Sequence, residues 1–209
     1  MQQKIITMLQ MQEAMNEKVH ADWTTQNFEW YRAIWIEAAE LLDHYGWKWW
    51  KKQQPDRDQV VLELIDIWHF GLSILLSEYR AHSEIAEKIA RELKVVAEEE
   101  DFRLLLEAFA LETLKTRAFD LRGFARLMAG MQLDFDELFR TYVGKNVLNF
   151  FRQDNGYKDG SYVKVWNNKE DNEHLAEVVA DLDDNRSDFR QAVYNGLKER
   201  YQTHAHMHI

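Results

Sequence analysis

Two pairs of carboxylates repeat the same spacing in this chain: Glu37 with Glu40, and Glu63 with Asp66. Both pairs lie in stretches of helical periodicity, where residues three apart share one face. Apolar residues surround both pairs, so we expect the acids to face inward rather than toward solvent. If the two helices pack antiparallel, four negative charges meet at one place. A hard cation, which prefers oxygen ligands, would neutralise these carboxylates. The pattern therefore predicts a Mg²⁺ site with these four ligands.

The elements that must position these acids are helices. Between Glu40 and Glu63 lie 22 residues, enough for a helix to finish, turn and return. One proline and eight glycines leave few positions that break a helix. We expect a single all-α domain over 1–209, a helical bundle with a disordered tail at 203–209. Periodicity predicts helices at 3–19, 27–45, 59–80, 83–99, 134–153, 171–183 and 186–202, and one or two more within 101–129. Residues 154–169 are expected to form a polar loop, and the strand-like segment 162–166 is interpreted as an extended part of that loop.

Composition excludes several classes of protein. The net charge of −10 argues against general nucleic-acid binding, which needs a basic surface. The absence of cysteine excludes disulfides, a thiolate zinc site and a cysteine nucleophile. The N-terminal residues do not form a signal peptide, and no run of about 18 apolar residues predicts a transmembrane helix. We therefore expect a cytoplasmic protein without a membrane partner.

A basic segment stands out against this acidic background. Between residues 145 and 169 there are five basic residues and two acidic ones. Lys145, Asn149 and Arg152 follow a spacing of i, i+4 and i+7, which places them on one helical face. Such a strip suits phosphate oxygens, and arginine can bind them through two nitrogens. A surface helix with salt bridges is the alternative interpretation.

Three weaker signals concern a planar ligand. Gln12 and Asn16 share a helix face and carry the donors and acceptors that a pyrimidine edge requires, although two exposed polar residues are the more common outcome. The tryptophans at 47, 49 and 50 could stack on a base or form a hydrophobic corner. His69 and Phe70 lie three and four residues after Asp66, and burial in the core is the simplest interpretation of both.

Taken in order, these motifs resemble those of the all-α nucleoside triphosphate pyrophosphohydrolases, the superfamily that includes MazG, and within it the dimeric dUTPases. The similarity spans about residues 9–172, and the segment 80–130 matches no motif. The late basic blocks are its specific part, because the acidic motifs alone would fit any member of the superfamily. The matching segments are 9–12 with Asn16, 37–43 with 47–51, 63–70, 145–149 with 152–158, and 164–166 with 169–172.

The resemblance implies a homodimeric enzyme that hydrolyses dUTP, and also dUDP, to dUMP. It implies two or more Mg²⁺ ions per site, with Mn²⁺ as a substitute, and attack of water at the β-phosphorus. Glu37, more than Glu40, would position or deprotonate that water. Gln12 and Asn16 would read uracil, and Phe70 would pack on the deoxyribose. His69 and Trp49 would lie next to the substrate. The phosphates would be bound by Lys145, Arg152, Tyr157 and Lys164. Asn149 and Asn172 would lie near the sugar or the phosphates.

Three other interpretations compete with this one. A MazG-like enzyme for another nucleotide, such as dCTP, would keep the four acids without the Gln12 and Asn16 pair and without the blocks between Lys145 and Asn172. A di-iron bundle protein would need a Glu-x-x-His motif from two helices, and only Asp66 with His69 comes near it. A non-enzymatic helical protein that binds a partner would not depend on the acids at all.

Overall fold

The computed structural model describes residues 1–79, 81–94, 100–183, 186 and 188–206. It confirms the all-α fold, with about 72% of the chain in helices. The chain divides into two compact units, Met1–Phe139 and Arg140–Ile209, and each is described here by itself. Whether both belong to a single domain stays a prediction.

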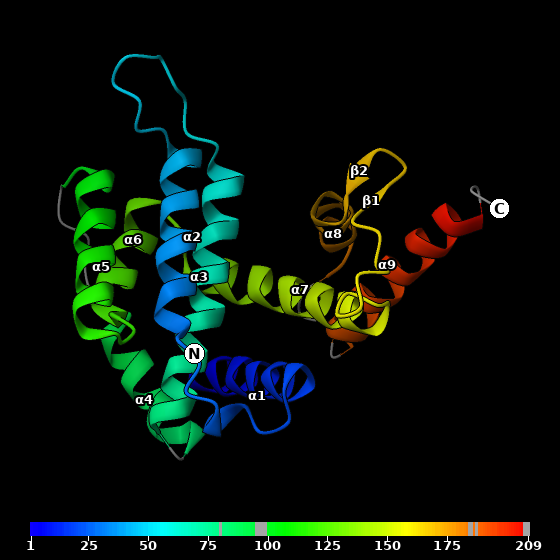
Figure 1. Cartoon of the computed structure of the whole chain (residues 1–209), viewed down its shortest axis with the longest axis horizontal. Coiled ribbons are helices and arrows are strands. Elements are labelled where there is room, and N and C mark those ends of the chain that lie inside the picture. The colour runs from blue at the N-terminus through cyan, green and yellow to red at the C-terminus, as the bar shows by residue number, and fades with distance from the viewer. Residues whose placement is uncertain (80, 95–99, 184–185, 187, 207–209) are drawn as a thin grey trace. The chain divides into compact units, whose positions relative to one another are not determined.

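Unit 1 is built from helices that pack around α3. In order they are α1 (Gln2–Val19), a 3-10 turn (Trp23–Thr25), α2 (Trp30–Tyr45), α3 (Arg57–Glu78), α4 (His82–Glu92), α5 (Phe102–Thr116) and α6 (Leu121–Gly130). Helix α2 runs beside α3, α1 packs on α3 and α4, and α5 packs on α2 and α6 (Figure 1).

Local sequence explains where these helices begin and end. Helix α2 stops at Tyr45 because Gly46 adopts a φ of 94°, a conformation that glycine tolerates. Helix α3 begins after Asp56, whose side chain accepts a hydrogen bond from the Gln59 backbone nitrogen. Residues 101–129 form two helices, because Arg117 ends α5 in the left-handed region and Asp120 caps α6.

Helix α3 is buried on most of its surface, as its composition predicts. Trp68 is fully buried and stacks on Phe124 at a centroid distance of 5.1 Å. Contrary to expectation, α3 is long and apolar enough to cross a membrane, by length and composition alone. However, 72% of its most apolar 18-residue stretch is buried inside the protein, as in the core helix of a soluble protein.

Unit 2 contains the last part of α7 (Phe135–Asp154), then β1 (Val165–Trp166), β2 (Lys169–Glu170), α8 (Asp171–Ala180) and α9 (Phe189–His206). The two strands form an antiparallel hairpin with Trp166 opposite Lys169, where the sequence predicted extended loop. Asn167 and Asn168 both adopt positive φ angles, which a two-residue hairpin turn requires.

The predicted tail needs a correction. Helix α9 continues through His206, so residues 203–206 are helical where a disordered tail was expected. Residues 207–209 lie outside the described residues, as do residues 95–99 of the helix predicted at 83–99.

Candidate active site

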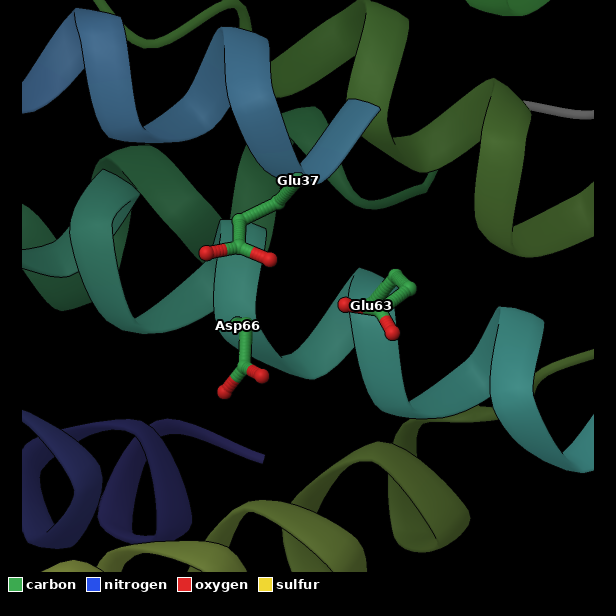
Figure 2. Close-up of side chains that lie close together, drawn as sticks. All are labelled: Glu37, Glu63 and Asp66. Carbon is green, nitrogen blue, oxygen red and sulfur yellow. The ribbon is translucent and has the colours of Figure 1, made fainter. Parts of the chain in front are cut away.

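Three carboxylates converge between α2 and α3. Glu37 projects from α2 toward Glu63 and Asp66 on α3 (Figure 2). One oxygen from each lies within 4.8 Å of the others. The convergence follows from the helical hairpin, because Glu37 and the α3 acids all lie about two turns from the loop that joins the helices.

Glu40 does not join this cluster, so the prediction that four carboxylates meet at one place is wrong. The Glu40 side chain is exposed to solvent. Trp35 and Ile36 on the same helix are also exposed, by 47% and 49% of their surface. Two of the apolar neighbours that suggested burial are therefore on the surface of α2, whereas Ala38 and Leu41 lie in the core. Glu40 still acts on Glu37 through its charge. Its role as a ligand stays a prediction.

The electrostatics of the cluster favour a cation or a proton. Burial, then the charge of Asp66, then a hydrogen bond and the charge of Glu63 raise the pKa of Glu37 to about 8. His44 approaches the cluster from the end of α2, with its Nε2 3.6 Å from Glu63 Oε1. In the metal-free protein, Glu37 therefore holds a proton at neutral pH.

The three acids suit a divalent metal ion. Opposite ligands of Mg²⁺ lie about 4.2 Å apart, twice a bond length of about 2.1 Å, and the oxygens of the cluster lie within 4.8 Å. Oxygen ligands alone match a hard cation such as Mg²⁺ or Mn²⁺. A bound cation would replace the proton on Glu37 and remove the repulsion between the carboxylates.

The predicted base-reading residues form a buried network in unit 1. Gln12 and Asn16 are each only 4% exposed, so the interpretation of two exposed polar residues is wrong. Gln12 Nε2 donates to Asn16 Oδ1 at 2.9 Å, and Gln12 Oε1 lies 2.7 Å from His69 Nδ1. Ser73, which sequence reasoning missed, lies at the centre of the network and bonds both amides.

The aromatic candidates of unit 1 differ in exposure. Phe70 is half-buried and stacks on Trp30, with a distance of 6.2 Å between the ring centroids. Trp49 is 90% exposed and makes edge contact with Trp50, which is also exposed. The three tryptophans after α2 therefore do not form a buried hydrophobic corner, and Trp49 is accessible to a planar ligand.

The candidates for phosphate binding lie in unit 2 around a buried ion pair. Arg152 donates through Nε and Nη2 to the two oxygens of Asp171, each at 2.8 Å. Its Nη1 donates to Asn149 Oδ1 at 3.3 Å, as their shared helix face predicts. Sequence reasoning missed Asp171, which is fully buried at the start of α8 and also accepts from the Tyr162 hydroxyl at 2.9 Å.

The other predicted residues of unit 2 range from buried to exposed. Lys145 is buried, Asn172 is half-buried, and Tyr157 and Lys164 are exposed. The salt-bridge interpretation applies to Arg152, although its partner lies on α8 and the pair is buried rather than on the surface. Exposed Lys169 also pairs with Glu177. Tyr157 and Lys164 are therefore the members of the set most accessible to a ligand.

Our first prediction concerns the proton on Glu37. The folded protein binds this proton up to about pH 8, whereas the unfolded chain releases it near pH 4.5. Between these values the folded state binds more protons, so the free energy of unfolding should fall as pH rises. We expect Glu37→Gln to flatten this dependence in EDTA, measured by urea denaturation at pH 5, 6, 7 and 8. The exposed Glu107→Gln should keep the wild-type slope, and equal slopes for all three proteins would contradict the assignment.

Our second prediction concerns Asp171. Burial alone would raise its pKa, but the hydrogen bonds and charge of Arg152, with Tyr162 and Lys164, outweigh burial and lower the pKa. The pair therefore contributes stability above the ordinary pKa of aspartate, which is lost as pH falls through the lowered value. Asp171→Ala leaves the Arg152 guanidinium buried without its counter-ion.

We expect Asp171→Ala to lower the free energy of unfolding by about 3–5 kcal/mol, measured by urea denaturation at pH 7. The exposed Asp159→Ala is the control and should cost far less. A change below about 1 kcal/mol for Asp171→Ala would show that the pair contributes no more than a surface salt bridge.

Comparison with known proteins agrees with this geometry. A protein family described as dUTPase matches residues 4–157, a range that contains the acidic cluster, the buried amide network and Arg152. No curated protein matches the chain. Because the match covers well over half of the chain, this protein belongs to the all-α dUTPase family and is a dUTP diphosphatase.

Proposed function

We propose that this dUTPase cleaves dUTP into dUMP and pyrophosphate in a Mg²⁺-dependent reaction, with Mn²⁺ as a substitute, and that it also hydrolyses dUDP. The observation that carries the proposal is the cluster of Glu37, Glu63 and Asp66, whose oxygens lie within 4.8 Å. When bound there, two or more Mg²⁺ ions would neutralise the phosphate chain and favour attack by water at the β-phosphorus.

In this proposal Glu37 positions the attacking water and accepts its proton. Burial and the neighbouring acids hold a proton on Glu37 in the metal-free protein, and a bound cation would displace it and leave a carboxylate able to accept a proton from water. Glu37 alone of the three comes from α2, facing the two acids of α3 (Figure 2). Glu63 and Asp66 act as metal ligands. Glu40, exposed on the next turn of α2, would become a further ligand through a change of rotamer.

The buried amides of Gln12 and Asn16 would read the uracil edge. Burial raises selectivity, because a base with the wrong donors leaves polar groups unpaired at a cost of about 1–3 kcal/mol each. Phe70, next to His69 on α3, would pack on the deoxyribose. The exposed ring of Trp49 would add a stacking surface.

The phosphates would be bound by residues of unit 2. The described hydrogen bonds of Arg152 use three of its five N–H groups, which leaves one on each terminal nitrogen for phosphate oxygens. Lys164 and Tyr157 are exposed and would approach the phosphates by side-chain movement, together with Lys145. Asn149 and Asn172 would complete the contacts, and a buried oxygen of Asn172 has no hydrogen-bond partner among the residues that the structure describes.

We also propose a homodimer. Leu104, Leu111 and Leu114 are all exposed and follow a spacing of i, i+7 and i+10 along α5. Helix α5 packs on α2, which exposes Trp35 and Ile36. An apolar surface of this kind is typical of a protein–protein interface. A cytoplasmic location and the lack of nucleic-acid and membrane partners stay predictions from the sequence.

A nucleotide panel tests the proposed reaction. With Mg²⁺ we expect dUTP to give dUMP and pyrophosphate, dUDP to react, and dCTP to react poorly, measured by ion-exchange chromatography. Water labelled with ¹⁸O should place the label in pyrophosphate if attack is at the β-phosphorus. Glu63→Gln should lose most activity, about 100-fold or more, and Glu107→Gln should lose little. Release of orthophosphate from dUTP, or full activity in EDTA, would refute the proposal, and a preference for dCTP would favour the other nucleotide class.

The dimer has its own test. Leu111 is 67% exposed, so Leu111→Glu should fold normally and place a charge in the interface. We expect the mass from sedimentation equilibrium to shift from dimer toward monomer. The exposed Lys18→Glu on α1 should leave the mass unchanged. A wild-type protein that sediments as a monomer at micromolar concentration would contradict the proposal.

A further inference from the structure

Four polar side chains form a closed ring of hydrogen bonds inside unit 1. Gln12 and Asn16 come from α1, and His69 and Ser73 come from α3. All four are buried, with Ser73 at 0% exposure. Because these side chains are largely removed from water, most of their donors and acceptors pair with one another. The arrangement of each amide is therefore set by its neighbours.

The Ser73 hydroxyl is the point where these bonds meet. Its oxygen accepts from Gln12 Nε2 at 3.1 Å and from Asn16 Nδ2 at 3.0 Å, which fills both lone pairs. Its single hydrogen has two acceptors in reach, the His69 carbonyl at 3.1 Å and Asn16 Oδ1 at 3.3 Å. In this arrangement Ser73 accepts from both amides, so it holds a nitrogen of each toward α3.

The rest of the ring has the same polarity when His69 carries its proton on Nδ1. Gln12 Oε1 lies 2.7 Å from His69 Nδ1, so it accepts when that nitrogen carries the proton. The second hydrogen of Gln12 Nε2 goes to Asn16 Oδ1 at 2.9 Å. If the Asn16 amide turned over, its nitrogen would face the Gln12 nitrogen with no acceptor between them, and its oxygen would keep only the Ser73 hydroxyl as a donor. The ring therefore favours one orientation of Asn16.

This orientation decides what Asn16 offers to a ligand. Asn16 Oδ1 already accepts from Gln12 and is in reach of Ser73, whereas the bond to Ser73 uses one of the two hydrogens on Nδ2. The remaining group is an N–H donor. A donor matches the carbonyl oxygens of uracil and opposes the amino group that cytosine carries at the same position.

We propose that Ser73 is a positioning residue that sets base selectivity, by holding the Gln12 and Asn16 amides so that Asn16 presents an N–H donor to a carbonyl-bearing pyrimidine. The proposal rests on the proposed role of these amides as base readers. Ser73 acts through them and makes no contact with the base itself.

The test compares Ser73→Ala with Ser77→Ala. Both remove a hydroxyl from α3, but the Ser77 hydroxyl bonds only the Ile74 carbonyl, at 2.7 Å, within the described residues. We expect Ser73→Ala to lower the ratio of kcat/KM for dUTP to that for dCTP by about tenfold, because the Asn16 amide is then able to turn over. Ser77→Ala should keep the wild-type ratio. Alanine favours helices, so both variants should fold, which a thermal melt checks.

A second measurement reads the ring directly. The ¹⁵N chemical shifts of the His69 ring should show a protonated Nδ1 in the wild type and in Ser77→Ala, and a mixture of tautomers in Ser73→Ala. An unchanged ratio, equal losses for both nucleotides, or an unchanged His69 spectrum in folded Ser73→Ala would overturn the proposal. If the wild type itself shows no preference for dUTP over dCTP, the base-reading role fails, which is a different outcome from failure of Ser73 alone.

Discussion

Repulsion between like charges is the constraint on which the site in unit 1 depends. Glu37, Glu63 and Asp66 are held within 4.8 Å, although each would be better solvated in water. The α2–α3 hairpin holds them there because α3 buries apolar residues on most of its surface, including Leu64, Ile65 and Trp68 on either side of the acids. Burial of these side chains, each about 1.5–3 kcal/mol, offsets the cost of gathering the acids. A proton on Glu37 relieves part of that cost, and a cation that displaced the proton would relieve the repulsion among all three acids.

Helix α3 also connects the acidic cluster to the buried amide network of unit 1. Glu63, Asp66, Phe70 and Ser73 recur at intervals of three or four residues, so they form one stripe along the helix, about 15 Å long. The acids lie at one end of this stripe and the buried amide network at the other. A nucleotide has the same order, with phosphates at one end and a base at the other. The order of the roles that we propose along this stripe, metal ligands, a sugar contact and a base reader, therefore matches the order of the groups in the substrate.

The sequence predicted those parts of the site that follow from helical periodicity. It placed Glu63 and Asp66 on one face of a buried helix because the apolar residues around them fill every side of α3. The same argument failed for Glu40, since Trp35 and Ile36 on α2 are exposed and shield nothing. It also undervalued Gln12 and Asn16, because their burial depends on polar partners from α3 that lie 57 and more residues away in the chain. Periodicity describes one helix at a time, and these errors arise where two helices meet.

The Arg152–Asp171 pair shows the same limit and has a consequence for binding. No spacing rule links residues of α7 and α8, so the acid that pairs with the arginine was not predicted. An arginine held at two points by a buried carboxylate loses little side-chain entropy when it binds an anion. The hydrogen bonds within the described residues leave two of its N–H groups for the phosphate that we propose it binds, without a break from Asp171. Replacing Arg152 would therefore leave a buried aspartate without its counter-ion, whatever its effect on binding, so the exposed Lys164 is the better position at which to test the proposed phosphate contacts.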